Sequence, residues 1–274
     1  MNLHHDPLWP RAGGWPSPEP GVRAAVALLG VPTFARSLSP TNAHETPAAV
    51  RDALRRYSLQ TEFTVVDAGD TMRAVDIEQI EADLLIAIGG DNSATVPVAR
   101  GRHAAGLVTV DAHHDLRDGS SNGSPVRELI EAGLSGRRVV QVGIEPFANS
   151  REYAARAADL GITVVTRDEL RRRPIADVMA EAIALAAHGA GAVHVDLDVD
   201  VCDRAVAPAC PASVPGGISA LELRDAARVA GAHPAVTSID LVEVDPTADT
   251  PDQRTVRLVA LCVLEALAGY GTRP

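Results

Sequence analysis

The sequence predicts an α/β protein with a mainly parallel sheet that is covered by helices on both faces. Short apolar runs alternate with amphipathic stretches from about residue 25 to the end of the chain. Most of the apolar runs carry Val, Ile or Leu at nearly every position, which is typical of strands buried on both faces. No repeat or linker divides the 274 residues, a length that fits one large α/β unit. We therefore expect an irregular N-terminal arm (1–24) followed by a single domain (25–274).

The candidate elements follow one another in strand–helix order. Thr46 can cap the first candidate helix and Pro47 fits its first turn, so that helix has a clear start signal. The candidate strands are Ala25–Val31, Glu62–Asp67, Leu84–Ile88, Leu107–Asp111, Arg138–Val142, Ile162–Val165, Ala192–Asp198 and Val236–Val244. The candidate helices are Thr46–Tyr57, Ser124–Ala132, Asn149–Asp159, Ala176–Ala187, Ser219–Ala230 and Pro251–Gly269. Alternation of this kind builds crossover connections between parallel strands.

Composition excludes several classes of function. The formal net charge is −11 and no basic stripe is present, so nucleic acid is not an expected partner. All 25 basic residues are arginine, which excludes enzymes that need a Schiff-base lysine or a phosphate-loop lysine. The three cysteines are too widely spaced for a disulfide framework. The apolar runs are shorter than a membrane span and Met1–Pro20 lacks an apolar signal core, so we expect a cytoplasmic protein with no membrane partner.

Polar clusters follow four of the candidate strands. They are Gly89–Ser93, Asp111–Asp115, Asp196–Asp203 and Glu243–Pro246. In a parallel sheet the ligand-binding loops follow the carboxyl ends of the strands. The four clusters are therefore expected to meet at one edge of the sheet and to form a site.

Two of these clusters have the spacing of a metal site. Asp111, His113 and Asp115 alternate along what we interpret as extended backbone, so their side chains leave on the same side. Asp198 and Asp200 repeat the pattern on another strand. Carboxylates with one imidazole suit Mn²⁺ or a similar divalent ion better than Zn²⁺, and without a cation the carboxylates would repel one another. Caps and solvated turns would account for one such aspartate but poorly for all four.

The same residues indicate a reaction. Two metal ions about 3.5–4 Å apart can activate a water molecule towards an electrophilic carbon. Glu243, at the end of the last candidate strand, is placed to pair with a cationic amidine or guanidinium, although a surface glutamate is an equally ordinary interpretation of that position. The pattern therefore favours a metal-dependent hydrolase.

In their order and spacing, the clusters resemble the motifs of the ureohydrolases, the family of arginase, agmatinase and formiminoglutamase. Gly-Gly-Asp-Asn at 89–92 resembles the family's Gly-Gly-Asp-His, and 111–115 matches Asp-Ala-His-x-Asp. Residues 198–203 with 207–209 match Asp-x-Asp-x-x-Asp followed by Pro-Ala/Gly, and 243–246 resembles Glu-Val-Asn/Asp-Pro. Each motif alone is weak, but the combination is specific and the resemblance covers almost the whole chain.

The resemblance implies a fold, a cofactor and an assembly. The fold is a three-layer α/β/α domain around an eight-stranded, mostly parallel sheet. The cofactor is a binuclear Mn²⁺ centre, and the assembly is a homo-oligomer of three or six subunits. For the ligands it implies that Asp115 and Asp198 bridge the metals, that His113 and Asp200 bind one ion and that Asp111 binds the other.

The catalytic residues implied by the resemblance are Asp115 and Glu243, with Glu243 binding the amidine nitrogen of the substrate. The chain departs from the family pattern at residue 92, which is Asn where most members place a metal-binding histidine. An amide oxygen is the weaker ligand, so we expect Asn92 to hold one metal loosely. Position 122 is Asn where arginases carry a proton-shuttling histidine.

The segment 122–125 with Arg127 resembles the formiminoglutamase branch of the family. This implies hydrolysis of N-formimino-L-glutamate to L-glutamate and formamide, a step of histidine degradation. Arginine is the preferred side chain for binding carboxylates, so Arg127 and Arg36 are the candidates for binding the two carboxylates of that substrate. Asn122 and His114 are also candidate substrate-binding residues, although strict alternation turns His114 away from the metal-binding side chains.

Two alternatives to this function remain open at the level of the sequence. One keeps the metal chemistry but changes the substrate to a guanidino compound, such as agmatine or a guanidino acid, with release of urea. The other is a non-catalytic relative whose metal site is weakened by Asn92.

Overall fold

The computed structural model describes residues 6–58, 61–189 and 191–274. Eight strands form one sheet: β1 (Ala24–Val31), β2 (Val65–Asp70), β3 (Ala82–Gly89), β4 (Gly106–Val110), β5 (Val139–Ile144), β6 (Thr163–Thr166), β7 (Val193–Asp198) and β8 (Val236–Val242). Their order across the sheet is β2-β1-β3-β8-β7-β4-β5-β6, and every neighbouring pair is parallel. The carboxyl ends of all these strands therefore lie at one edge.

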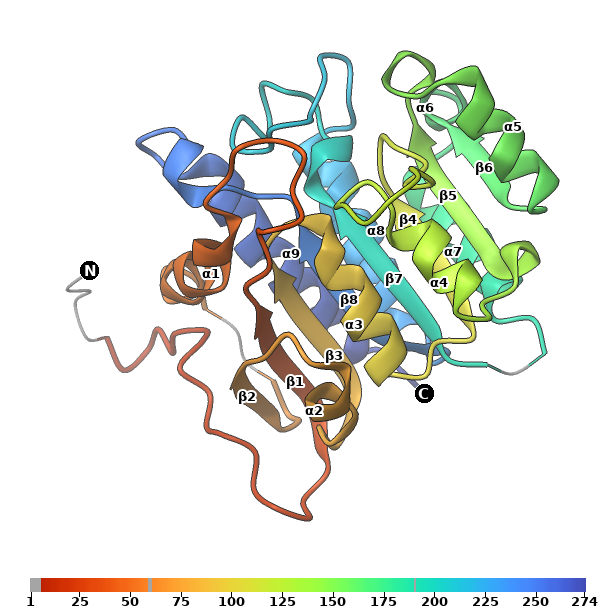
Figure 1. Ribbon diagram of the computed structural model, residues 1–274. Helices are drawn as coiled ribbons and strands as arrows, with labels where there is room; N and C mark the ends of the chain where they lie inside the picture. Colours follow the sequence, from red (N-terminus) through yellow and green to blue (C-terminus); the bar gives the residue numbers. More distant parts are fainter. Residues whose placement is uncertain (1–5, 59–60, 190) are drawn as a thin grey trace.

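Nine α-helices are described along the same part of the chain. They are α1 (Thr46–Leu54), α2 (Ala74–Glu78), α3 (Thr95–Gly101), α4 (Pro125–Glu131), α5 (Arg151–Asp159), α6 (Arg167–Leu170), α7 (Ile175–Ala186), α8 (Ala220–Ala232) and α9 (Arg254–Tyr270). Figure 1 shows α3 and α4 in front of the sheet and α8 and α9 behind it.

The predicted elements are confirmed, with corrections at their ends. All eight candidate strands are present, although β2 begins at Val65 and not at Glu62. All six candidate helices are present as well. Helices α2, α3 and α6, which span five, seven and four residues, were not predicted. Helices as short as these show little periodicity.

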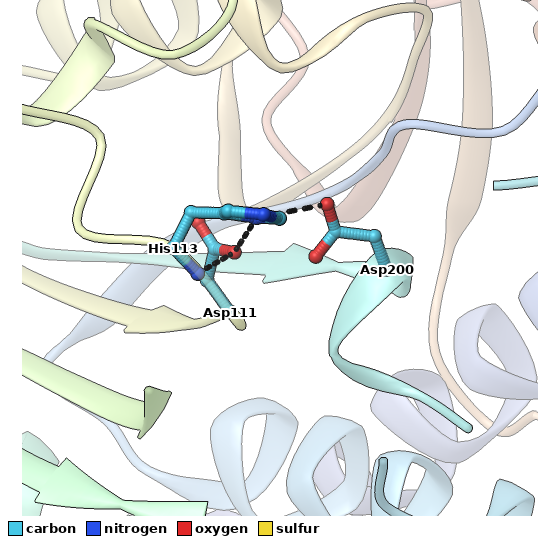
Figure 2. A group of neighbouring side chains, drawn as sticks. All are labelled: Asp111, His113 and Asp200. Atoms are coloured by element: carbon cyan, nitrogen blue, oxygen red, sulfur yellow. Dashed lines mark hydrogen bonds and ion pairs between the residues drawn. The ribbon is translucent and has the colours of Figure 1, made fainter. Parts of the chain in front are cut away.

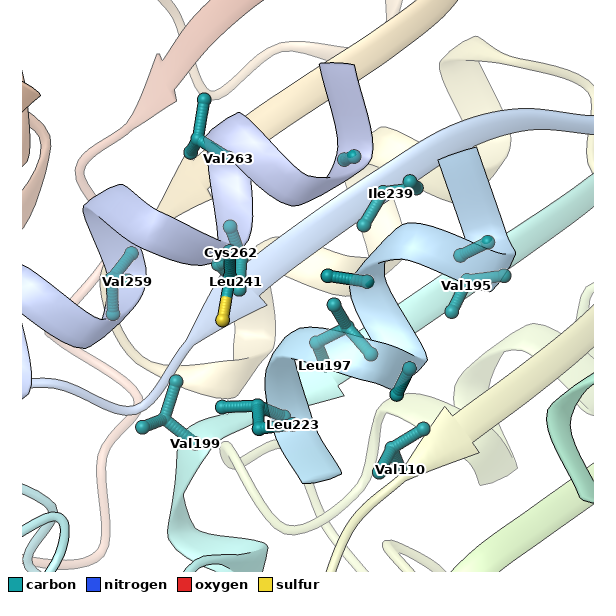
Figure 3. Packing of buried hydrophobic residues seen from close by; sticks show 14 of the residues in the cluster. Val110, Val195, Leu197, Val199, Leu223, Ile239, Leu241, Val259, Cys262 and Val263 are labelled. Carbon is teal, nitrogen blue, oxygen red and sulfur yellow. The ribbon is translucent and has the colours of Figure 1, made fainter. Parts of the chain in front are cut away.

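One face of the sheet is apolar from edge to edge. In the central strands, every second residue points into a single large cluster together with side chains of α1, α7, α8 and α9. Figure 3 shows the middle of this cluster, where Leu197 of β7 and Leu241 of β8 meet Leu223 of α8 and Val259 of α9. These side chains are buried almost completely, which makes this face the main hydrophobic core.

The opposite face is divided. Ile77 and Val98 of α2 and α3 pack on the β1–β3 side of the sheet, while Val126 and Ala157 of α4 and α5 pack on the β4–β5 side. The fold is therefore the predicted three-layer α/β/α sandwich. Between the two clusters, the central strands carry buried polar residues. These are Thr109, Asp111, His194, Asp196, Asp198, Ser238 and Asp240.

Glycine at position 90 lets two loops meet at the carboxyl edge. A Cβ atom built on Gly90 would lie 1.8 Å from the carbonyl oxygen of Thr33. The backbone N–H of Gly90 donates to Val31 O at 2.9 Å, and that of Asp91 donates to Thr33 O at 3.0 Å. The loop after β3 is thereby fixed against the loop after β1, and it presents Asn92 at the edge of the sheet.

The N-terminal arm runs along the outside of the fold. From residue 6 to residue 23 it contains no helix or strand, apart from an isolated antiparallel bridge between Arg11 and Ser58. Residues 1–5 of the predicted arm lie outside the described residues. Within the part of the chain that the structure describes, no helix combines the length and apolar character needed to cross a membrane.

Candidate metal centre and substrate pocket

A pocket of about 330 Å³ opens at the carboxyl edge of the central strands. The predicted site residues that line it are Asn92, His113, His114, Asp115, Asn122, Asp198, Asp200 and Glu243. Asp111 is fully buried beneath them. Residues from β3, β4, β7 and β8 are thus brought together, as expected from the positions of the polar clusters at the ends of parallel strands.

The tightest group in the pocket consists of Asp111, His113 and Asp200. One potential ligand atom from each lies within 4.8 Å of the others. Nδ1 of His113 is 3.1 Å from Oδ2 of Asp200 and 3.3 Å from Oδ1 of Asp111. Figure 2 shows the imidazole between the two carboxylates, with Asp111 and Asp200 approaching from the ends of β4 and β7. Nitrogen and oxygen donors therefore converge on one point.

The backbone around these ligands is not the extended chain that we predicted. β4 ends at Val110, and Asp115 has a φ angle of 51°, which is the left-handed region that non-glycine residues rarely occupy. Asp200 lies in a short 3₁₀ helix, Val199–Val201, that Asp198 caps by accepting from the N–H of Asp200 at 2.8 Å. Tight turns and not strand alternation therefore aim these side chains.

The electrostatics of the site call for cations. Burial raises the pKa of Asp198 well above its usual range, and the carboxylates of Asp200 and Asp111 raise it further. The pKa of Asp115 is raised in the same way, by burial and then by Asp111. Burial and Asp200 raise the pKa of Asp111 to about 6. Burial opposes the charge on His113, yet Asp200 and Asp111 raise its pKa to about 12.

Two buried oxygens in this group, Asp111 Oδ2 and Asp200 Oδ1, have no hydrogen-bond partner among the described residues. Unpaired buried carboxylate oxygens are costly. Hard oxygen donors around one imidazole are the ligands that Mn²⁺ prefers, and a divalent cation would relieve the repulsion among them. The donor set therefore fits the predicted metal.

Asn92 does not present its side chain as the sequence suggested. Its amide nitrogen donates to Oδ2 of Asp115, and its amide oxygen accepts from Thr95 Oγ1 at 2.7 Å. The atom expected to bind metal therefore faces away from the other ligands. Asn92 holds Asp115 in place instead, because only the NH₂ group of an amide can donate to a carboxylate.

Glu243 is part of the pocket wall and not a surface residue, since only 5% of it is exposed. It follows β8 with a φ angle of 65°. Its Oε1 atom accepts from the backbone N–H of Asn92 at 2.7 Å and from Nδ2 of Asn122 at 2.6 Å. Burial raises its pKa to about 8, although these two hydrogen bonds act in the opposite direction. Strained backbone is typical of residues whose placement matters for function.

Asn122 connects Glu243 to the loop after β1. Its Oδ1 atom accepts from the backbone N–H of Leu38 at 2.9 Å, and its own N–H donates to Arg36 O at 2.9 Å. Leu38 and Ser39 of that loop line the pocket. Asn122 thus fixes both the carboxylate of Glu243 and the outer wall of the pocket.

His114 also lines the pocket, so it does not turn away from the site as strict alternation implied. Its Nδ1 atom lies 2.6 Å from Oε1 of Gln141, and its backbone N–H donates to Asn149 Oδ1 at 2.9 Å. Burial lowers the pKa of the imidazole and His113 lowers it further, although the hydrogen bond to Gln141 acts the other way. Gln141 and Asn149 therefore hold His114 in one orientation.

The two predicted carboxylate-binding arginines make other contacts. Arg127 donates to Arg117 O at 2.7 Å and to Glu131 at 2.5 Å, and Arg36 donates to Glu128. Neither side chain lines the pocket. Both stabilise the loops around the pocket. Arg127 ties α4 to the loop after β4, and Arg36 ties the loop after β1 to α4.

Arg117 is the pocket cation that the sequence interpretation missed. Its side chain is exposed, lines the pocket and has no ion-pair partner among the described residues. A Cβ atom on Gly123 would lie 2.7 Å from Cδ of Arg117, so glycine leaves room for this side chain against the neighbouring loop. The sequence held a signal, since Arg117 lies only two residues after Asp115 in the same loop.

Known proteins resemble this chain in sequence and in fold. A formimidoylglutamase of Halalkalibacterium halodurans is 34% identical over 275 residues, covering 88% of this chain and 86% of that protein. The crystal structure of formimidoylglutamase from Bacillus subtilis matches with a TM-score of 0.91 and 28% identity, covering 100% of this chain and 95% of that one. A formiminoglutamase of Trypanosoma cruzi, solved with Mn²⁺, gives a TM-score of 0.82 and 25% identity over 92% of this chain and 95% of that one.

The sequence model of the Arginase family matches residues 24–269, nearly the entire described fold. The match contains all of the acidic residues that converge in the pocket. The predicted ureohydrolase resemblance is thereby confirmed, and the chain belongs to the arginase family.

Proposed function

We propose that this protein is a Mn²⁺-dependent hydrolase that converts N-formimino-L-glutamate and water into L-glutamate and formamide. The observation that carries the proposal is the pocket itself, whose lining includes buried carboxylates of the metal-ligand set, Glu243 and Arg117, a cation with no ion-pair partner among the described residues. The formimino group is a cationic amidine at neutral pH, and the rest of the substrate carries two carboxylates. The charges of pocket and substrate are complementary. Similarity to formimidoylglutamases supports the same substrate.

The metal ligands in this proposal are Asp111, His113, Asp115, Asp198 and Asp200. Manganese bound there supplies Lewis acidity, which makes a water molecule nucleophilic at neutral pH. Asp111, His113 and Asp200 offer donor atoms within 4.8 Å of one another, so these three residues would hold one ion together.

The second metal position is the weaker one in this proposal, because the amide oxygen of Asn92 accepts from Thr95. We expect metal analysis of protein purified without added Mn²⁺ to find about one ion per chain or fewer. Two tightly held ions per chain would contradict this expectation. In that case Asn92→His should leave the Mn²⁺ content unchanged. If the proposal holds, Asn92→His raises the Mn²⁺ content.

Glu243 orients the amidine. The N–H of Asn92 and the NH₂ of Asn122 both bond to Oε1, which leaves Oε2 without a donor among the described residues. An amidinium N–H can occupy that position, and its positive charge would keep the buried carboxylate ionised despite a pKa of about 8. Water adds to the formimino carbon held in this way, and the bond from that carbon to the glutamate nitrogen breaks.

Arg117 binds a carboxylate of the substrate in this account. Arg117→Met should raise KM for N-formimino-L-glutamate about 10- to 100-fold with a smaller change in kcat, because a lost charge-assisted hydrogen bond is worth about 1.5–3 kcal/mol. Arg171→Met, at an exposed arginine that pairs only with Asp168 among the described residues, is the matched control and should leave KM unchanged. An unchanged KM in Arg117→Met would remove Arg117 from the binding site.

The substrate is tested by product analysis. Mn²⁺-loaded protein is incubated separately with N-formimino-L-glutamate, agmatine and a guanidino acid, and formamide and urea are measured. We expect formamide from the first substrate and little urea from the others. Urea as the main product would assign the protein to guanidino compounds. No turnover in excess Mn²⁺, or after Asn92→His, would favour a non-catalytic relative.

The assembly remains a prediction from the family. We propose a homo-oligomer of three or six subunits, in the cytoplasm, with no nucleic-acid or membrane partner. Light scattering after size-exclusion chromatography measures the mass directly, and a mass of 28.6 kDa would correspond to a monomer and contradict the proposal.

A further inference from the structure

His114 stands at the pocket wall on the side of β5. In the sheet, β8, β7, β4 and β5 are consecutive neighbours. Glu243 follows β8, the metal ligands follow β7 and β4, and His114 is bonded to Gln141 of β5. The carboxylate of Glu243 and the ring of His114 therefore flank the metal ligands from opposite sides.

Gln141 determines which nitrogen of His114 carries the proton. Its Nε2 atom donates to the carbonyl oxygen of His114 at 2.8 Å, so Oε1 is the atom that faces Nδ1 of the ring. An amide oxygen can only accept, and Nδ1 must therefore carry the hydrogen. In a neutral imidazole the other nitrogen, Nε2, then has a free lone pair.

The orientation of the ring is held from several directions. Gln141 is completely buried and paired in register with Thr109 of β4. The backbone of His114 is bonded on both sides, through its N–H to Asn149 and through its carbonyl to Gln141. No described residue partners Nε2, and His114 lines the pocket. The lone pair is thus a fixed acceptor that is available to a ligand.

We propose that His114, fixed by Gln141 as the Nδ1–H tautomer, accepts a hydrogen bond through Nε2 from the substituted N–H of the amidine. This inference rests on the proposed function. The planar amidinium group H₂N=CH–NH–R⁺ has one nitrogen on each side of the reacting carbon. With the terminal nitrogen on Glu243 and the carbon above the metal ligands, the substituted nitrogen faces His114. The pocket then selects amidines whose leaving nitrogen bears a hydrogen.

The kinetic test crosses one substitution with one change in substrate. N-formimino-L-glutamate is compared with its analogue methylated on the substituted nitrogen, using Mn²⁺-loaded wild type and His114→Phe. A polar site rejects an analogue that leaves it unpaired, so wild type should prefer the N–H substrate by at least ~100-fold in kcat/KM. In His114→Phe, which keeps a ring but has no acceptor, the preference should fall at least ~10-fold. His188→Phe, at an exposed histidine away from the pocket, is the matched control and should keep the wild-type preference.

A second measurement reports the tautomer without relying on activity. Nitrogen NMR of ¹⁵N-histidine-labelled full-length protein, with His114→Phe used for assignment, distinguishes a protonated from an unprotonated ring nitrogen. Near neutral pH we expect a protonated Nδ1 and an unprotonated Nε2 in wild type. Gln141→Leu removes the positioning residue, so it should give a mixture of tautomers. Its preference for the N–H substrate should fall between those of wild type and His114→Phe.

The outcomes separate the inference from the proposed function. Turnover with an unchanged preference in His114→Phe overturns the inference alone, as does an Nε2–H tautomer in wild type. If no variant hydrolyses N-formimino-L-glutamate while urea forms from a guanidino compound, the proposed function fails and this assignment of the N–H fails with it.

Discussion

The two faces of the central strands differ sharply, although the same three strands form both of them. On one face, β4, β7 and β8 contribute only aliphatic side chains such as Leu197 and Leu241 to the main core. On the other face, Thr109, Asp196 and Asp240 lie side by side in register across the three strands and are completely buried. Burial raises the pKa of Asp196 well above its usual range, and the neighbouring carboxylate of Asp240 raises it further.

The difference shows how this fold separates stability from function. The apolar face buries hydrocarbon against four helices, which is the dominant favourable term in folding. The polar face ends at Asp111 and Asp198, where carboxylates are held close together at a cost to stability. Substitutions on the polar face should therefore affect activity, and substitutions on the apolar face should affect folding.

The largest expected effect is on activity, from Asp198→Asn. Loss of this carboxylate should lower Mn²⁺-dependent turnover by more than ~100-fold, the upper range for residues that merely support a ligand. The metal-free protein should become more stable, because the pKa of Asp198 is raised and its ionised form is unfavourable in the folded state. Steady-state kinetics, metal analysis and metal-free melting curves check both halves. A variant with lower metal-free stability and normal turnover would refute the division between a polar face that serves activity and an apolar face that serves stability.

The next effect is on stability, from Leu197→Ala on the apolar face. Leu197 is fully buried, and removing its side chain should lower the free energy of unfolding by about 2–5 kcal/mol. Turnover per folded molecule should change little. Urea denaturation measures the loss, with Leu185→Ala as the control on α7, where 39% of the residue is exposed. Equal losses in the two variants would show that the apolar face does not carry the stability.

The smallest effect comes from Thr109→Val on the polar face. The hydroxyl of Thr109 is buried and has no hydrogen-bond partner among the described residues. Replacing such a group by an apolar one of the same shape should change the free energy of unfolding by less than ~1 kcal/mol. A loss above ~2 kcal/mol in urea denaturation would mean that the hydroxyl is bonded to a buried water molecule.

Much of the fold could be predicted because the strands and the longer helices carry strong periodic signals. The strand order could not, since it depends on which crossover connections pack together. The convergence of Asp111, His113, Asp198 and Asp200 was predictable from their places at strand ends. The strained turn at Asp115 was not, because nothing in its neighbours requires a left-handed backbone.

The differences between the expected and the observed contacts at the site have a common physical origin. The charge of Arg127 and Arg36 makes them candidates for binding carboxylates, but their partners Glu131 and Glu128 are set by helix α4 and the surrounding loops. The orientation of the Asn92 amide likewise depends on Thr95 and Asp115. Residue type can be read from the sequence, whereas the competition among partners is decided by tertiary packing.

The pH dependence of stability follows from the raised pKa values of the site. The pKa of Glu243 rises from 4.5 to about 8 on folding, and that of Asp111 rises from 3.8 to about 6. A raised pKa contributes stability fully below the unfolded value, and this contribution is lost as the pH rises through the folded value. The metal-free protein should therefore lose stability between about pH 5 and pH 9.

Melting curves with and without Mn²⁺ at about pH 6 and pH 8 test the central claim, that the polar edge is a metal site. Mn²⁺ binds the ionised carboxylates, so it should raise Tm at both pH values and more at pH 8. The gain should be largely absent in Asp198→Asn. The same Tm with and without Mn²⁺ at pH 8, or an equal gain in Asp198→Asn, would contradict the account.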